Sequence, residues 1–299
     1  MRVVISGASG QLGRLVAEQL LGQLSPDDVI LVTRTPDALA EYANLGAEVR
    51  HGDFDEPDSL PGAFSGGDRL LLISTMDVGR RVHQHRAALE AADRVGIQHV
   101  VYTSSTNPVP GHPVGQAVDE HRETEEMLRD RDFAWTVLRN AAYAELQVPL
   151  GALAVTYGRL VTNAGNGRVA PISRNDCAAV AATVLTGPGH DGRVYEITGP
   201  EALSQSDIAR LITAVAGRPV RVVPTGDRRL MWSLGRLGTP KPVARTIVDL
   251  GIATREGYFD VVDPAFEQIT GRSPRTLRDV LVAHRDDLLG SEEARVAYG

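Results

Sequence analysis

Three glycines near the start of the chain, Gly7, Gly10 and Gly13, follow one another at three-residue spacing. A short apolar run at residues 3–5 precedes them, and leucine and valine recur at helical spacing after them. This order predicts a buried strand, a tight turn and an amphipathic helix. The first glycine permits the turn, the second lets the backbone approach a pyrophosphate, and the third lets the helix pack on the strand. We therefore predict a dinucleotide-binding turn, and the alternative is a tight turn that binds nothing.

A cation follows the next predicted strand, residues 29–33. That strand ends at Thr33 and is followed by Arg34, with a second threonine after it. An NAD site usually has Asp or Glu at this point, which bonds the ribose 2′-hydroxyl. A cation between two hydroxyls suits a 2′-phosphate instead, so the sequence favours NADP(H). The alternative is that Arg34 is a solvated loop residue, and the nearby Asp27 and Asp37 keep that alternative open.

Further apolar segments at residues 47–51, 69–75, 99–105 and 133–138 alternate with amphipathic ones. This alternation predicts an α/β fold, a Rossmann-type doubly wound parallel sheet covered on both faces. We assign residues 1–150 to this NADP-binding domain and expect later segments to return to it. Residues 151–299 are predicted to form a smaller α+β cap that binds substrate. Within the cap, residues 160–169 are predicted to form a hairpin.

Several candidate binding residues follow the carboxyl ends of these strands. In a doubly wound sheet, ligands bind at that edge, where the strand order switches. The residues after the third strand are either adenine neighbours or a cap for the next helix. Ser104 and Ser105, at the end of the fifth strand, are either polar groups at the reaction site or a cap for the next helix. These candidates are Asp53, Phe54, Ser74, Thr75, Met76 and Ser104.

Composition excludes several other classes of protein. The chain has 299 residues and a formal net charge of −7 without any basic run, so nucleic acid is not an expected partner. Cys177 is the only cysteine, which excludes an intrachain disulfide and fits a cytoplasmic protein. We expect no signal peptide and no membrane span. His83 and His85 lie two residues apart, on different sides of a predicted helix, and no metal site is expected.

Taken together, these motifs resemble the NmrA-like group of atypical short-chain dehydrogenase/reductases, and within it the NAD(P)H:quinone oxidoreductases of type 2. The resemblance implies a Rossmann domain, a small cap, bound NADP(H) and a small-molecule acceptor, a quinone. The matching stretches are GASGQLG (7–13), LLLIST (70–75), VGRRVHQHR (78–86), DEHRETEEML (119–128), LRNAAYAE (138–145), RVAPISRNDCAAV (168–180) and VYEITG (194–199). The cofactor contacts that the resemblance implies are Gly7, Ala8, Ser9, Gly10, Gln11, Leu12, Arg34, Ser74, Thr75, Met76, the stretch Leu138, Arg139, Asn140, Ala141, Ala142 and Tyr143, and Arg174 from the cap.

The chain departs from most short-chain dehydrogenases in its catalytic residues. Those enzymes use Tyr and Lys four residues apart, whereas the only lysine here, Lys241, has Leu237 four residues before it. We expect catalysis by orientation of nicotinamide against acceptor, with Asn140 as a polarising hydrogen bond and Tyr143 as a wall or second donor. Packing is the alternative for both residues, and Ser104 is an alternative polar group.

Two other functions fit the same motifs. One is a redox-sensing regulator that binds NADP(H) without turnover and acts through a protein partner. The other is a reductase of a different conjugated or carbonyl substrate, because the loop at residues 107–115 and the cap determine the pocket. As for the oligomeric state, a homodimer is compatible with the sequence.

Overall fold

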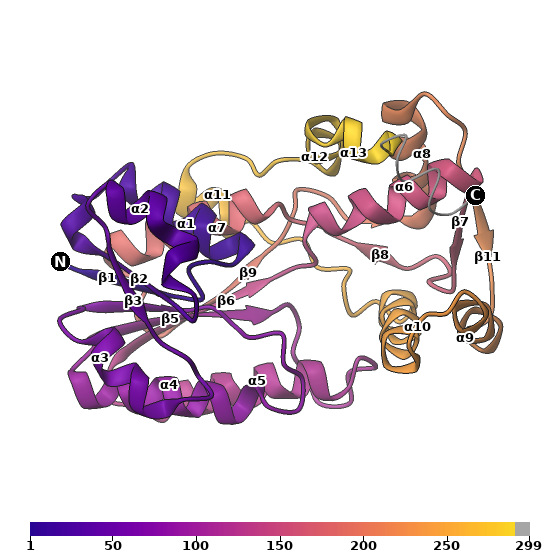
Figure 1. Ribbon diagram of the computed structural model, residues 1–299. Helices are drawn as coiled ribbons and strands as arrows, with labels where there is room; N and C mark the ends of the chain where they lie inside the picture. The colour runs from indigo at the N-terminus through magenta and orange to yellow at the C-terminus, as the bar shows by residue number, and fades with distance from the viewer. Residues whose placement is uncertain (291–299) are drawn as a thin grey trace.

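A computed structural model describes residues 1–290 of the protein (Figure 1). Seven parallel strands form the main sheet in the order β3-β2-β1-β4-β5-β6-β9. The order reverses between β1 and β4, so the sheet is doubly wound and the predicted Rossmann-type fold is confirmed. The strands are β1 (Val3–Ser6), β2 (Val29–Thr33), β3 (Glu48–His51), β4 (Arg69–Leu72), β5 (His99–Ser105), β6 (Ala134–Asn140) and β9 (Arg193–Ile197).

Helices cover both faces of this sheet, which explains why its central strands are apolar throughout. In β1, Val3 and Ile5 join one hydrophobic core and Val4 joins the other. Figure 1 shows the two helical layers on opposite sides of the strands. One layer contains α1 (Gln11–Leu21), α2 (Ala40–Asn44), α7 (Arg174–Thr186) and α11 (Ala265–Thr270). The other contains α3 (Leu60–Phe64), α4 (Arg81–Val95) and α5 (Gln116–Arg129). Short 3₁₀ turns are η1 (Pro26–Asp28), η2 (Pro36–Leu39) and η3 (Pro57–Ser59).

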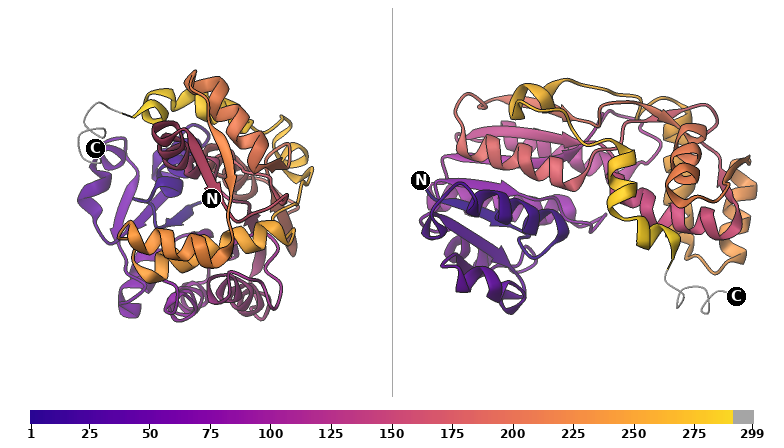
Figure 2. Two further views of the ribbon diagram at one scale, coloured as in Figure 1. Left: turned by 90° about the vertical axis from the view of Figure 1, so that its right-hand side faces the viewer. Right: turned by 90° about the horizontal axis from the view of Figure 1, so that it is seen from above.

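The smaller cap begins directly after β6 and has a hydrophobic core of its own. Seen from above, it lies beside the sheet domain (Figure 2). Its helices are η4 (Ala144–Leu146), α6 (Gln147–Tyr157), α8 (Gln205–Ala216), α9 (Asp227–Arg236), α10 (Lys241–Arg255), α12 (Leu277–Ala283) and α13 (Arg285–Leu289). Its strands are β7 (Arg159–Thr162), β8 (Arg168–Val169), β10 (Leu203–Ser204) and β11 (Arg221–Pro224).

The hairpin predicted over residues 160–169 is wrong. β7 pairs in parallel with β11, and β8 pairs antiparallel with β10. The connecting turn is drawn away by contacts with later helices: the Asn163 amide donates to Asp227 at 2.8 Å and to the carbonyl oxygen of Val248 at 3.0 Å. Gly167 lies so close to Thr254 that a Cβ there would stand 1.9 Å from its carbonyl oxygen.

Segments after residue 150 also complete the sheet domain. β9 forms the seventh strand beside β6, and α7 and α11 pack in the layer with α1. The chain therefore crosses between the sheet domain and the cap more than once. Within residues 1–290, no helix is both long and apolar enough to cross a bilayer.

Candidate functional site

The glycine turn has the close contacts that its sequence predicts. Gly7 follows β1 with φ +65°, a conformation that favours glycine. The N–H of Gly10 donates to the carbonyl oxygen of Gly7 at 3.0 Å, which closes the turn. A Cβ on Gly13 would stand 2.4 Å from that same oxygen and 2.7 Å from Cα of Ala8. Helix α1 can approach β1 this closely only because residue 13 has no side chain.

The side chains of this turn divide into two kinds. Ala8 and Leu12 are buried in the first core, so only their backbone groups can face a ligand. Gly10 and Gln11, at the start of α1, are exposed. The first turn of a helix presents N–H groups without intrahelical partners, and these suit a phosphate.

Hydroxyl groups connect this turn to the end of β2. Ser9 and Thr33 share a hydrogen bond of 2.7 Å between their side-chain oxygens, and Thr33 also accepts the N–H of Thr35 at 3.2 Å. Arg34 lies between the two threonines and is exposed. Sequence reasoning missed Arg14, whose Nε donates to the carbonyl oxygen of Ser9 at 3.2 Å and thus adds a second cation beside the same turn.

The candidate residues in the loops after β3 and β4 make different kinds of contact. Asp53 accepts the N–H of Asp55 at 3.0 Å, a local turn contact, and Phe54 packs edge-on against the His85 ring at 6.4 Å. After β4, the N–H of Ser74 donates to the Thr103 hydroxyl at 2.9 Å. Thr75 is held by side chains of α4, and the Met76 side chain is 89% exposed.

At the ends of β5 and β6, two candidate residues face a buried carboxylate. Ser104 donates to Glu125 at 2.7 Å, and Arg139 donates to both Glu125 oxygens at 2.9 and 2.7 Å. Burial opposes ionisation of Glu125, but the hydrogen bonds from Arg139 and Ser104 hold its pKa below the ordinary value. Both side chains are therefore committed to a network that holds α5 on the sheet. Leu138 is buried in the first core.

Asn140 and Tyr143 lie together at the end of β6. Asn140 is 8% exposed, and its Oδ1 is buried without a hydrogen-bond partner among the described residues. The Arg174 guanidinium lies 4.6 Å from the centroid of the Tyr143 ring, and Glu145 accepts the backbone N–H of Arg174 at 2.9 Å. Burial raises the pKa of Tyr143 above its ordinary value, so its hydroxyl stays protonated. The cluster offers an unused acceptor, amide donors and a phenol.

A loop from β5 reaches across to the cap beside this cluster. The N–H of Thr106 donates to the carbonyl oxygen of Asn140 at 3.2 Å, which places the start of the loop at the cluster. The Asn107 amide then donates to the carbonyl oxygen of Tyr258 at 3.1 Å. Further along the loop, the His112 ring packs on Tyr258 at 4.6 Å. This loop and the cap together bound one side of the candidate site.

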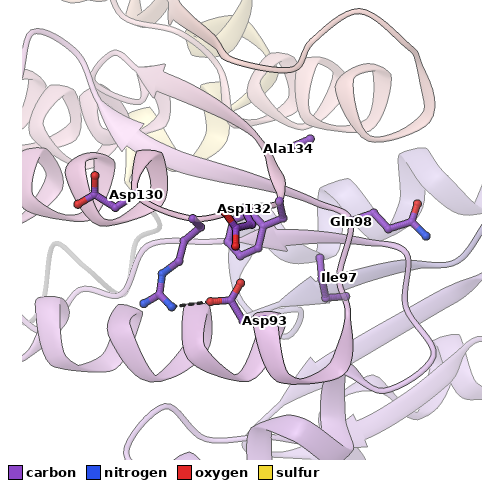
Figure 3. Close-up of a pocket in the computed structure, with 8 residues that line it drawn as sticks. Asp93, Ile97, Gln98, Asp130, Asp132 and Ala134 are labelled. Carbon is purple, nitrogen blue, oxygen red and sulfur yellow. Dashed lines mark hydrogen bonds and ion pairs between the residues drawn. The ribbon is translucent and has the colours of Figure 1, made fainter.

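Other features of the molecule lie apart from this site. A hollow of about 660 Å³ opens at the starts of β5 and β6, the opposite edge of the sheet (Figure 3). There Arg131 pairs with Asp93 at 2.5 Å. Lys241 opens α10 in the cap. Across residues 1–290, no group of three His, Cys, Asp or Glu side chains is arranged to hold a metal ion.

A doubly wound sheet with a glycine turn at its switch point defines a dinucleotide-binding protein of the Rossmann type. The NAD(P)H-binding family matches residues 7–188. Quinone oxidoreductase 2 of Escherichia coli is 34% identical over 86% of this chain and 90% of its own. An NmrA-like family domain-containing oxidoreductase of Aspergillus flavus is 28% identical over 96% of this chain and 97% of its own. The chain belongs to the NAD(P)H-binding family and, within it, to the NmrA-like atypical short-chain dehydrogenase/reductases, which are oxidoreductases.

The three-dimensional comparison agrees with this assignment. The structure of an NADPH-dependent quinone oxidoreductase from Escherichia coli, complexed with NADPH, matches with a TM-score of 0.90 and 32% identity. The match covers 94% of this chain and 99% of that one, so it includes the cap as well as the sheet domain. The predicted family is thereby confirmed.

Proposed function

We propose that the protein is a reductase that uses NADPH to transfer a hydride to a quinone-type acceptor. The observation that carries this proposal is the unpaired, buried Oδ1 of Asn140 beside the Tyr143 hydroxyl, at the edge of the sheet where a dinucleotide lies. A buried polar atom without a partner is costly unless a ligand satisfies it. The names of the Escherichia coli relatives, which describe quinone reduction with NADPH, support the same conclusion.

The residues of the glycine turn fit such a cofactor. The absence of a side chain at Gly13 lets α1 begin directly against the turn, and the free N–H groups at the start of α1 suit the phosphate groups of the cofactor. Arg34 is exposed beside the Ser9–Thr33 contact, and a 2′-phosphate there would gain a charge-assisted hydrogen bond. When bound, NADPH supplies the hydride, which carries two electrons and one proton to the acceptor.

The chain's own residues orient the reactants and stabilise the product oxygen. With NADPH bound, the buried Asn140 oxygen would accept an N–H of the cofactor and so help to orient the nicotinamide against the acceptor. The Tyr143 hydroxyl, kept protonated by burial, donates a hydrogen bond to the acceptor oxygen as negative charge develops on it. Solvent water supplies the second proton of the hydroquinone. Because that oxygen is much less basic than an alkoxide, no Tyr–Lys pair is required.

Steady-state oxidation of NADPH with 1,4-benzoquinone tests the proposal. We expect Asn140→Ala to lower kcat by roughly 100-fold, because the reacting ring is no longer held in place, and to raise the Kd for NADPH by at most about tenfold, the loss of one neutral hydrogen bond. Asn44→Ala, at an exposed asparagine in α2, is the matched control and keeps full activity.

Tight NADPH binding without turnover on any of a panel of benzoquinones and naphthoquinones would overturn the reductase proposal and favour the regulator. If the protein turns over only other conjugated acceptors, the proposed hydride transfer stands, but the acceptor is not a quinone.

A further inference from the structure

Three side chains at the start of α4 converge on a single loop residue, Thr75. Arg81 Nε donates to the Thr75 carbonyl oxygen at 2.7 Å, and Gln84 Oε1 accepts the Thr75 hydroxyl at 2.7 Å. His85 Nε2 accepts the Thr75 N–H at 3.2 Å. All three polar atoms of Thr75 are thus held by one helix. These α4 residues belong to the VGRRVHQHR stretch, to which the proposed reaction assigns no role.

The protonation of these groups matches their contacts. Thr124 donates its hydroxyl to the carbonyl oxygen of Glu120 at 2.8 Å, so it accepts from His85 Nδ1 at 3.0 Å. His85 therefore carries its proton on Nδ1 and offers Nε2 as the acceptor for Thr75. Burial lowers the pKa of His85 well below its ordinary value, which keeps the ring neutral and Nε2 free to accept.

Gln84 also reaches a second loop. Its Nε2 donates to Asp55 Oδ1, after β3, and to Asp77 Oδ2, after β4, each at 3.1 Å. Gln84 is 3% exposed, so one buried amide uses its oxygen and both of its N–H donors to connect two loops. Buried polar groups are costly unless satisfied, and a fully satisfied network fixes its members in one arrangement.

The two loops lie at different parts of the proposed cofactor site. Thr75 follows β4 at the switch point. The segment that contains Thr75 lies next to the glycine turn, because a Cβ on Gly7 would be 3.7 Å from Cβ of Ile73. Asp55 follows Asp53 and Phe54, in the loop that approaches the adenine in folds of this type. Gln84 is a buried side chain that bonds directly to both loops.

We propose that Gln84 is a positioning residue that couples the loop after β3 to the loop after β4, so that the site is shaped in advance for a whole dinucleotide. This inference rests on the proposed cofactor site. If Gln84 couples the two loops, the coupling must strengthen the binding of NADPH more than the binding of its adenosine half, because only the whole cofactor would reach both loops. If Gln84 had only a local packing role, its replacement would change the Kd values of both ligands by the same factor.

The test compares two ligands by calorimetric titration without any acceptor: NADPH, and 2′,5′-ADP as the adenosine half. Gln84→Met keeps the length of the side chain and removes every hydrogen bond. We expect it to raise the Kd of NADPH roughly tenfold, within the usual range of coupling between two sites, and to leave the Kd of 2′,5′-ADP within about twofold. His83→Ala, at an exposed residue of the same helical turn, is the control and leaves both Kd values unchanged.

A second variant covers the case in which Gln84→Met does not fold. Asp55→Ala keeps Gln84 and its bond to Thr75 and removes the acceptor that connects Gln84 to the loop after β3, so it is expected to change the same ratio of Kd values. Equal weakening of both ligands, or no change in either, would overturn the coupling. Because these titrations need no turnover, they are independent of whether the wild-type protein reduces quinones.

Discussion

Arg34 and Arg14 are both cations beside the glycine turn, but their surroundings differ. Arg14 pairs with Glu41 and donates to the backbone oxygens of Ser9, in the glycine turn, and of Ala38, so its charge is already compensated. Arg34 is exposed, and within residues 1–290 its guanidinium has no ion pair. Of the two, Arg34 is the cation that can bond a 2′-phosphate without first losing another partner.

Replacing Arg34 by Ala should therefore weaken NADPH selectively. A hydrogen bond to a charged group contributes about 1.5–3 kcal/mol, so we expect the Kd of NADPH to rise roughly 10- to 100-fold and that of NADH to change little. Fluorescence titration with each cofactor measures the two values. Arg210→Ala, at an exposed arginine of α8 in the cap, is the control. If NADPH and NADH weaken by the same factor, Arg34 does not recognise the 2′-phosphate.

Among the elements, β1 and α1 are the pair whose contact depends on one missing side chain. Gly13→Ala would place a Cβ against the backbone of Gly7 and Ala8, and backbone cannot move aside as the end of a flexible side chain can. Overpacking of this kind costs about 1–3 kcal/mol. The same shift would move the start of α1 away from the phosphate positions.

We therefore expect Gly13→Ala to lower the free energy of unfolding and to weaken NADPH binding, as measured by urea denaturation and titration. Gly62→Ala in α3 is the matched control, because no atom lies within 4 Å of its added Cβ. That variant should gain about 0.5–1 kcal/mol, since alanine is the better helix former. Equal stability of the two variants would contradict the close contact.

The elements also show which parts of the fold could be predicted from the sequence. The sheet strands and the glycine turn were predictable because their signals are local, an apolar run and a spacing. The pairing of β7 with β11 was not, because β11 lies far along the chain and Asn163 is held by α9 and α10 rather than by a turn.

The same distinction applies to the candidate site. Asn140 and Tyr143 come from one short stretch at a strand end, and a motif can show them together. The contacts of α4 with Thr75 depend on how a helix packs under a loop, and spacing alone says only that His83 and His85 face different sides. His85 is buried and His83 is exposed, as that spacing predicts.

For the molecule as a whole, buried neutral histidines make stability depend on pH. His99, at the start of β5, is 8% exposed and shares a 2.8 Å hydrogen bond with the Thr136 hydroxyl. Burial lowers its pKa from 6.5 to about 4; Arg69 and His190 act in the same direction, and Asp191 opposes them. Below pH 6.5 the unfolded chain binds this proton more readily than the folded protein does, so acid favours unfolding.

The free energy of unfolding should therefore fall as the pH drops from 6.5, and the loss is complete only below pH 4, where both states are protonated. For His99 alone the loss reaches about 2 kcal/mol at pH 5 and about 3 kcal/mol at most. His99→Gln keeps a donor for Thr136 but cannot titrate, so urea denaturation at pH 7 and pH 5 should show a smaller loss in this variant than in the wild type. His83→Gln, at an exposed position, should behave as the wild type. Because His99 lies at the edge of the sheet opposite to Asn140, this change should reduce stability in acid without altering NADPH affinity at pH 7. Identical losses in His99→Gln and the wild type would assign the acid sensitivity to other groups.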